Sequence, residues 1–250
     1  MIVVRFIRRI YNYYFSTDKT FVRTLTSLIG FVPANLPLYK LAFLHKSYAH
    51  GIRISQNNER LEYLGDAILG TIVAEYLFKK YPSRNEGFLT KMRSKIVKRK
   101  SLNDIADQMG LDVFLIQNGV DNVSHSMLGN ALEALVGAVY LDVGYARTRR
   151  FVIYKILRGY LDIRQLETYD DNYKSQLLEW CQKTNKVVSY RVDSKFKFDN
   201  RDRFKVSVLI DEQEKATAED FSKKSAEQLA SKEALEILGV FAEAAVEENG

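Results

Sequence analysis

The sequence predicts an all-α domain followed by a small α+β domain with the element order α-β-β-β-α. Up to about residue 160, apolar residues recur at helical spacing, strand-like alternation is rare, and the chain's only three prolines lie in this part. From Gly159 to Asn172 the sequence turns polar and acidic, as a linker does. Beyond it, alternating apolar residues indicate strands, and a final apolar-periodic stretch indicates a helix.

A chain of 250 residues is long enough for two domains. The patterns above divide it into five segments. The segments are an N-terminal basic extension at 1–24, the helical domain at 25–160, a linker at 161–171, the α+β domain at 172–240 and an acidic tail at 241–250. Within the α+β domain, helices are expected at 173–183 and 222–238, and strands at 187–192, 204–210 and 214–219.

The first fifteen residues, MIVVRFIRRIYNYYF, mix arginines with apolar residues. A signal peptide needs an uninterrupted apolar core after its basic start, which is missing here. A basic amphipathic helix could lie on a membrane or on RNA phosphates, but an ordinary surface helix is the simpler interpretation. No run reaches the roughly 18–20 apolar residues of a membrane span, and the single cysteine, Cys181, fits a reducing compartment. We therefore expect a cytoplasmic protein with no membrane partner.

The most informative stretch is NNERLEYLGDAILG at residues 57–70. It places Glu59, Glu62 and Asp66 within an arc of about 60° on one helix face. The opposite side carries the apolar residues expected in a core, namely Leu61, Leu64, Ile68 and Ile72. Like charges at this spacing are unfavourable, so the acids need a cation, raised pKa values or full solvation. The spacing alone leaves a divalent metal site and a solvated acidic face equally open.

A second segment favours the metal. From Leu128 to Leu141 the only charged residue is Glu133, and a buried lone carboxylate needs a partner or a metal. Asn130 lies three residues earlier on the same face, and its amide oxygen can also ligate a hard cation. Glu86, between the helix-breaking residues Pro82 and Gly87, is a further acid that would pass for an ordinary loop glutamate if it stood alone.

NERLEYLGDAILG, together with HKSYA at 45–49, EGFLTKMRSKIV at 86–97 and LGNALEALVGAVYLD at 128–142, resembles the ribonuclease III family over residues 25–240. The resemblance implies hydrolysis of double-stranded RNA with Mg²⁺, with Mn²⁺ as the alternative metal, to 5′-phosphate and 3′-hydroxyl ends. It also implies processing of ribosomal RNA precursors and structured transcripts. The implied catalytic acids are Glu59, Glu62, Asp66, Glu86 and Glu133, and the implied metal ligands are Glu62, Asp66, Asn130 and Glu133. The family usually has Asp at the position of Asn130, so we expect weaker metal binding here.

The α-β-β-β-α order and the sequence FSKKSAEQLASKEALEIL resemble a double-stranded-RNA-binding domain. In that family, Lys223 and Lys224 would contact phosphates across the major groove, and Ser175 and Glu179 would meet the minor groove. The segment KFKFDNRDR is expected to be a loop in which Arg201 and Arg203 supply a basic contact. The domain also departs from the family at Leu178, where Gln is common, and it carries 13 Lys and Arg against 14 Asp and Glu between residues 170 and 239.

The densest basic run lies elsewhere, within ten residues that contain no acid: Lys91, Arg93, Lys95, Lys98, Arg99 and Lys100. Such a run is either a solvated helix face or a strip that grips RNA phosphates beside the metal site. For RNA contact we select Lys91, Arg93 and Lys95. The net charge of +6 and the pI near 9.2 favour a polyanionic partner.

Tyr63, Leu69 and Val73 flank the acidic stripe instead of joining the core stripe, which suggests a second buried surface. In the resembling family this helix lies at a two-fold interface, and an aromatic residue at the position of Tyr63 enters the partner subunit. We therefore expect a homodimer with two equivalent metal sites. A Tyr63 that packs within its own subunit is the alternative.

A binding protein is the rival to an endonuclease. Such a protein would keep this fold and bind double-stranded RNA or the ribosome, with weak or no cleavage. Asn130 and the altered loop of the second domain favour it. The five retained acids favour the nuclease, which is our prediction.

Overall fold

The computed structural model describes residues 2–46, 56–168 and 172–240 and separates the chain into two compact units, 1–168 and 169–250. The expected acidic tail at 241–250 and Ser47 to Ala49 of the HKSYA motif lie outside the described residues. The boundary between the units falls after Thr168, so a helix at 163–168 belongs to the first unit although the sequence placed it in the linker. Each unit is described by itself.

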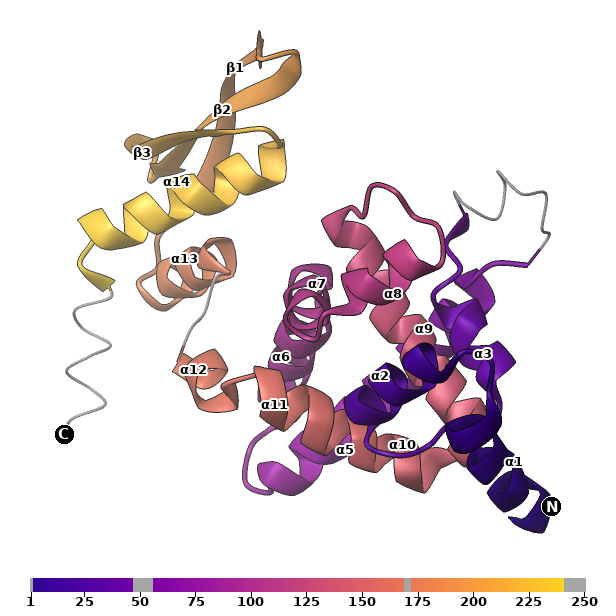
Figure 1. The fold of residues 1–250 in the computed structure, drawn as a ribbon. Helices are drawn as coiled ribbons and strands as arrows, with labels where there is room; N and C mark the ends of the chain where they lie inside the picture. Colours follow the sequence, from indigo (N-terminus) through magenta and orange to yellow (C-terminus); the bar gives the residue numbers. More distant parts are fainter. Residues whose placement is uncertain (1, 47–55, 169–171, 241–250) are drawn as a thin grey trace. The chain divides into compact units, whose positions relative to one another are not determined.

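The first unit is built from helices throughout its described part (Figure 1). They are α1 Ile2–Phe15, α2 Lys19–Ile29, α3 Leu36–Ala42, α5 Glu59–Lys80, α6 Glu86–Val97, α7 Arg99–Gln108, α8 Leu111–Gln117, α9 His125–Val143, α10 Tyr145–Phe151, the π-helix η1 Val152–Leu157, α11 Arg158–Tyr160 and α12 Ile163–Thr168. The supposed extension at 1–24 is part of this unit, because Phe21 and Val22 are buried in it. The all-helical class predicted for this part is confirmed.

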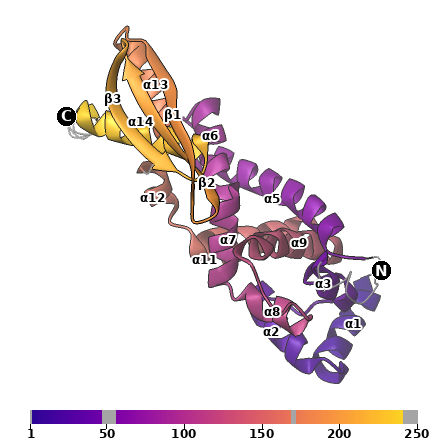
Figure 2. The same ribbon diagram turned by 90° about the horizontal axis from the view of Figure 1, so that it is seen from above.

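Helices α5 and α9 pack along each other at the centre of the unit (Figure 2). Two glycines permit the close approach. A Cβ atom on Gly65 would lie 1.7 Å from the carbonyl oxygen of Glu133, and one on Gly137 would lie 2.4 Å from that of Leu61. Real atoms cannot come so near, so the two backbones touch where the acids are. The Gly65 and Gly137 contacts therefore set the spacing between Glu62 and Asp66 on α5 and Glu133 on α9.

Helix α9 is the apolar core helix of the unit. Among the described helices it alone is long and apolar enough to cross a membrane, but most of it is packed inside the protein. Near its end, the buried Asp142 accepts hydrogen bonds from the backbone N–H of Ala34 (2.9 Å) and from the hydroxyl of Tyr39 (3.0 Å). These bonds satisfy a carboxylate that burial would otherwise penalise, and they attach the segment before α3 to the core.

The second unit has the predicted α-β-β-β-α order: α13 Tyr173–Lys183, β1 Val188–Phe198, β2 Arg201–Ile210, β3 Gln213–Asp220 and α14 Lys223–Ile237. The antiparallel sheet has the order β1-β2-β3, and α14 lies across it with α13 alongside (Figure 1). Its core joins Leu177 and Cys181 of α13 to Val208, Ala230 and Leu235.

The expected loop at 195–203 is wrong, because β1 and β2 extend through it as a hairpin. Only Asp199 and Asn200 form the turn, with φ angles of 50° and 58°. Two successive residues with positive φ make the tight turn whose twist matches that of paired strands, and Asp and Asn tolerate this conformation. The hairpin therefore presents paired strands where a loop was expected.

Candidate active site and RNA-binding surfaces

An open pocket of about 540 Å³ lies between α5, α7 and α9. It brings together five of the residues selected from the sequence, which are Glu59, Glu62, Asp66, Asn130 and Glu133. Helical periodicity places the first three on one face of α5, and the contact between Gly65 and α9 turns that face toward Glu133. The pocket is thus lined by oxygen donors from two helices held at a fixed distance.

The electrostatics of the pocket favour a cation. Burial raises the pKa of Glu133 to about 7, and the nearby carboxylates of Asp66 and Glu62 add to the rise, while Arg99 opposes it. Burial also raises the pKa of Glu62, again with opposition from Arg99. Carboxylates in this arrangement resist ionising together unless positive charge enters. A bound cation would relieve that strain.

Glu59 stands apart from this pair. Its carboxylate accepts hydrogen bonds from the ammonium of Lys46 (3.1 Å) and from the side chain of Asn57 (3.2 Å), which lower its pKa. Its charge is already balanced, so Glu59 lines the pocket as one half of an ion pair. Lys46, the second residue of the HKSYA motif, is a cation at this site that was not selected from the sequence.

The residues fit a hard divalent ion that keeps part of its water shell. The candidate donors are all oxygens: the carboxylates of Glu62, Asp66 and Glu133 and the amide oxygen of Asn130. Among the described residues, no three acidic, histidine or cysteine side chains are grouped so that they could hold a metal ion by themselves. Mg²⁺ does not need three such ligands, because it usually takes one or two carboxylates and retains several waters. When bound, such an ion supplies a Lewis acid and a water made nucleophilic at neutral pH.

Two further pocket residues were missed by the sequence analysis, which did not select Arg99 or Asn103 for the site. The chain breaks direction at Lys98, where ψ is 144°, and Arg99 then opens α7 beside the acids. A guanidinium there can offer a bidentate contact to a phosphate. The Oδ1 of Asn103 is buried and accepts no hydrogen bond within the described part of the chain. Arg99 did appear in the basic run, but only the fold shows that it alone of that run lines the acidic pocket.

Glu86 does not join the acids within one chain. It opens α6 and accepts a hydrogen bond from the Thr90 hydroxyl (2.8 Å). It lines a different pocket with Phe78 and Arg93, at the far end of α5. Tyr63, which lines the acidic pocket, and Phe78 are about 22 Å apart along the helix axis. Any role for Glu86 in catalysis therefore requires a second chain.

The basic strip is also divided by the fold. Lys95 is buried, and its ammonium donates to the carbonyl oxygen of Leu166 (2.8 Å), which ties α6 to α12. Its selection for RNA contact is therefore wrong, because a buried ammonium that is bound to the backbone cannot reach a phosphate. Lys91 and Arg93 are exposed on α6. The continuous strip expected from residues 91–100 becomes separate cations on two helices.

Of the apolar residues that flank the acids of α5, some are buried in the core and one is exposed. Leu69 and Val73 are buried in the core of their own unit, so they do not form a second surface. Tyr63 is 82% exposed, and Phe78, further along α5, is 70% exposed. Between them the outer face carries small residues, namely Ala67, Gly70, Thr71 and Ala74. A flat face with an aromatic ring near each end thus borders the acidic pocket.

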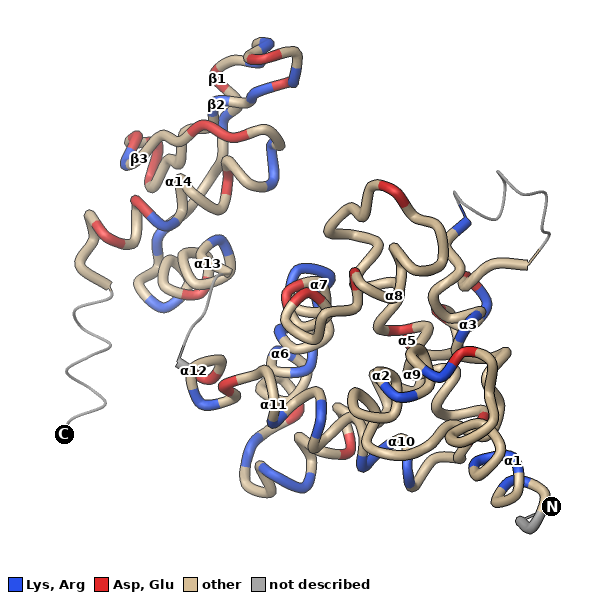
Figure 3. Tube along the Cα trace, in the orientation of Figure 1, with Lys and Arg blue, Asp and Glu red and all other residues tan. Residues whose placement is uncertain are grey.

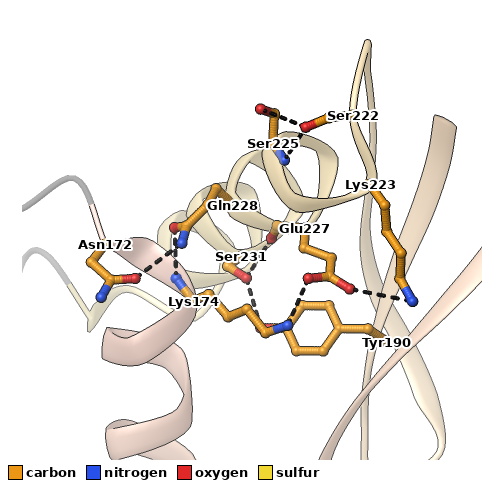
Figure 4. Close-up of polar contacts among 9 residues, drawn as sticks. All are labelled: Asn172, Lys174, Tyr190, Ser222, Lys223, Ser225, Glu227, Gln228 and Ser231. Carbon is orange, nitrogen blue, oxygen red and sulfur yellow. Dashed lines mark hydrogen bonds and ion pairs between the residues drawn. The ribbon is translucent and has the colours of Figure 1, made fainter. Parts of the chain in front are cut away.

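In the second unit, an ion-pair network braces the start of α14 against α13 (Figure 4). The carboxylate of Glu227 lies 2.6 Å from the ammonium of Lys174 and 3.9 Å from that of Lys223. Lys174 also lies over the ring of Tyr190, whose hydroxyl is 2.7 Å from that of Ser231. Lys223 is therefore partly neutralised.

The start of α14 suits an anion. The hydroxyl of Ser222 caps the helix by accepting from the backbone N–H of Ser225 (3.1 Å). Lys224 is exposed in the first turn, where the helix dipole also favours negative charge. On α13, Ser175 is half-buried and Glu179 is exposed, four residues apart on one face. The selected residues of the two helices thus remain available for a nucleic acid, with Lys224 the less committed of the two lysines.

On the hairpin, the two selected arginines differ in how far they are engaged. Arg203 lies over the rings of Phe198 and Phe221, with its guanidinium 5.2 and 5.6 Å from their centres, and its Nε is 3.7 Å from Glu219. Arg201 is exposed, 5.9 Å from the centre of the Phe221 ring. Because both lie on β2 and not in a loop, the strand fixes their direction.

Comparison with known proteins agrees with both units. The family model described as ribonuclease-III-like matches residues 35–160, and the double-stranded RNA binding motif matches residues 173–238. Ribonuclease 3 of Zunongwangia profunda is 42% identical, over 91% of this chain and 95% of its own length. Ribonuclease 3 of Bacteroides thetaiotaomicron is 40% identical, over 88% of this chain and 72% of its own. The nuclease domain of ribonuclease III from Campylobacter jejuni has a TM-score of 0.50 at 33% identity, covering 56% of this chain and 98% of that structure.

These matches confirm the family, the two-part fold class and the enzyme class expected from the sequence. The relative from Zunongwangia profunda matches this chain over nearly its whole length. The family as a rule uses a divalent metal. The acidic pocket lies in the part matched by the nuclease family, and the Lys223–Lys224 helix in the part matched by the RNA-binding motif. The chain therefore belongs to the ribonuclease III family and is an endoribonuclease that acts on double-stranded RNA.

Proposed function

We propose that this enzyme hydrolyses phosphodiesters of double-stranded RNA with Mg²⁺, for which Mn²⁺ can substitute, and leaves 5′-phosphate and 3′-hydroxyl ends. The ligands are Glu62, Asp66, Glu133 and the amide oxygen of Asn130. The observation that carries this proposal is the shared pocket in which burial and neighbouring acids raise the pKa of Glu133 to about 7. A site that disfavours its own negative charge binds a cation well.

The surrounding residues have supporting roles in this proposal. Arg99 contacts a phosphate of the substrate and partly offsets the acids before the cation arrives. Glu59 holds Lys46 at the edge of the pocket, where a second phosphate can pair with it. Lys91, Arg93, Lys223, Lys224, Ser175, Glu179 and Arg201 contact the rest of the duplex. The substrates are ribosomal RNA precursors and structured transcripts, cleaved in the cytoplasm.

Cleavage of a long RNA duplex tests the metal site. Glu133→Gln keeps the shape of the side chain but removes a negative ligand, so it should bind the duplex yet cut it at least a hundredfold more slowly. Asp104→Asn is the matched control, because Asp104 is an acid of α7 that pairs with His125 outside the pocket. The control should cut at the wild-type rate.

EDTA should abolish cleavage by the wild type, and Mg²⁺ should restore it. Wild-type rates from the Glu133→Gln variant would remove Glu133 from the site. Duplex binding by the wild type without cleavage in either Mg²⁺ or Mn²⁺ would instead favour the rival, a double-stranded-RNA-binding protein. The substitution of Asn130 for the family's usual Asp is the feature that motivates this rival.

We further propose a homodimer in which two copies of α5 pack antiparallel about a two-fold axis. Gly70 and Thr71 lie midway between Tyr63 and Phe78, so a two-fold axis there brings Tyr63 of one copy against Phe78 of the other. Phe78 shares a pocket with Glu86, and Tyr63 shares one with the acids. The same axis therefore carries Glu86 toward the acidic pocket of the second copy, which it cannot reach in its own chain.

Sedimentation velocity at micromolar concentration tests this arrangement. Tyr63→Asp places a charge at each end of the proposed contact, where Tyr63 meets Phe78 of the other copy, and the dimer should dissociate to monomers with loss of paired cleavage. Ile116→Asp is the matched control, since Ile116 is 55% exposed on α8 and away from α5. A wild type that sediments as a monomer, or a fully active Tyr63→Asp dimer, would contradict the proposal.

A further inference from the structure

Helix α1 packs with its polar side inward, the reverse of an ordinary amphipathic helix. Its buried Asn12 donates to the carbonyl oxygens of Pro33 (2.9 Å) and Ala34 (3.2 Å). Arg5 and Arg9 lie on the same side, since about 100° per residue places them within roughly 60° of Asn12, and both are half-buried. Polar contacts thus attach α1 to the segment that leads into α3.

The apolar side of α1 consequently faces outward. Seven large apolar or aromatic side chains are exposed there: Val4, Phe6, Ile7, Ile10, Tyr11, Tyr14 and Phe15. They are about a third of the 22 such residues exposed in the described parts of the chain, although α1 has only 14 residues. Ile7 and Tyr14, near the centre of this side, are 59% and 60% exposed. A soluble monomer rarely leaves so concentrated an apolar face uncovered, so something covers it.

The composition of α1 indicates which kind of partner can cover its apolar side. The helix contains Arg5, Arg8 and Arg9 and no acid, which Figure 3 shows as blue without red along its length. Arg8 is exposed at the edge of the apolar side. Two copies of α1 placed face to face would bring their Arg8 side chains together with no carboxylate on either helix to pair with them. An RNA duplex would meet Arg8 but offers little apolar surface for the aromatic residues.

An anionic lipid surface satisfies both features at once. Fourteen helical residues extend about 21 Å, which is too short to span a bilayer but suits a helix lying in the headgroup region. Tyrosine and phenylalanine rings are favourable at that depth, and arginine attracts acidic headgroups. Helix α1 also lies outside both family matches, which begin at residues 35 and 173.

We propose that α1 binds the enzyme to the surface of an anionic lipid bilayer. Its outward apolar side enters the interface, and the exposed Arg8 at the edge of that side contacts an acidic headgroup. The expectation of no membrane partner rested on the lack of a membrane-spanning run and on residues 1–15 being an ordinary surface helix, whereas α1 turns its apolar side outward. Docked in this way, the enzyme would act on RNA close to the cytoplasmic face of a membrane.

Flotation of the full-length chain with vesicles tests the proposal. The wild type should float with vesicles of equal parts phosphatidylglycerol and phosphatidylcholine, and about tenfold less with phosphatidylcholine alone. The double substitution Ile7→Glu and Tyr14→Glu should lower the bound fraction on anionic vesicles at least tenfold. Arg8→Glu should lower it several-fold on anionic vesicles and leave the weak binding to phosphatidylcholine unchanged.

Ile116→Glu, an exposed apolar residue on α8, is the matched control and should float like the wild type. This control shows whether an added acid lowers flotation wherever it is placed. Lys223 and Lys224 could also attract anionic vesicles, but the α1 substitutions leave both lysines in place and so measure the contribution of α1 alone. Equal flotation of the wild type and both α1 variants would overturn the proposal. Variants of α1 that float normally but no longer dimerise would also overturn it and would assign the face to a second copy. Variants that float normally but lose duplex affinity would assign the face to RNA instead. All variants should keep the wild-type rate of duplex cleavage.

Discussion

Glu133→Gln should make the metal-free enzyme more stable at about pH 8 while it slows cleavage at least a hundredfold. In the folded protein the pKa of Glu133 is about 7, above the ordinary value of 4.5 that applies to the unfolded chain. The stabilising contribution of this group is therefore complete below about pH 4.5 and is lost as the pH rises through about 7. Above that pH the ionised carboxylate opposes folding, and a neutral amide of the same shape does not.

The size of the effect follows from the shift. A rise from 4.5 to about 7 corresponds to about 3 kcal/mol, since each pKa unit is worth about 1.4 kcal/mol. Glu133 is only partly buried and faces an open pocket, so solvent screening reduces that value. We expect a gain of about 1–2 kcal/mol, or a rise of about 2–6 °C in the melting temperature of the first unit.

Thermal unfolding of both proteins in EDTA between about pH 4 and pH 8 measures this directly. The difference should vanish near pH 4, where Glu133 is neutral in both the folded and the unfolded wild type. Adding Mg²⁺ at pH 8 should stabilise the wild type more than the variant, because only the wild type has the third carboxylate. A variant that is less stable than the wild type at pH 8 without metal would refute the electrostatic argument.

Three further results follow from the same geometry. Gly65→Ala should lower the free energy of unfolding by about 3 kcal/mol or more and reduce cleavage, because its Cβ would collide with the Glu133 carbonyl. Gly159→Ala, with open space around it, should change that free energy by less than about 1 kcal/mol, and denaturant titration compares the two. Asn130→Asp should lower the Mg²⁺ concentration for half-maximal cleavage, and an unchanged requirement would mean that Asn130 is not a ligand. A chain ending at Thr168 should lose most duplex affinity at physiological salt yet still cut at low salt; equal affinity in a filter-binding assay would exclude a binding role for the second unit.

The relation of Glu59, Glu62 and Asp66 could be predicted because helical spacing is a local property. Residues three and four apart share a helix face wherever the helix packs, so a common face needed no tertiary information. The same holds for the alternation of Phe204, Val206, Val208 and Ile210 in β2. The chemistry of Glu133 was also visible, since one acid in a long apolar segment must have a compensating partner.

The hairpin could have been recognised more accurately. Asp199-Asn200 is a recognisable turn pair, and Phe196 and Phe198 on one side of it alternate with lysines. The strands extend to the turn because their residues pair from Val188 with Ile210 to Phe198 with Arg201, with one register shift between Val192 and Ser194.

The sequence by itself determined which residues share a face of a helix or strand, and hence the acidic row, the lone Glu133 in its apolar segment and the two-part fold. Tertiary structure alone decided which faces meet. It placed Arg99 and Asn103 beside the acids, buried Lys95 against Leu166, kept Glu86 at the far end of α5, and turned the apolar side of α1 outward. Periodicity specifies a side chain's direction only relative to its own axis. Which side is buried depends on contacts between distant segments, such as the bonds of Asn12 to Pro33 and Ala34, which no local pattern contains.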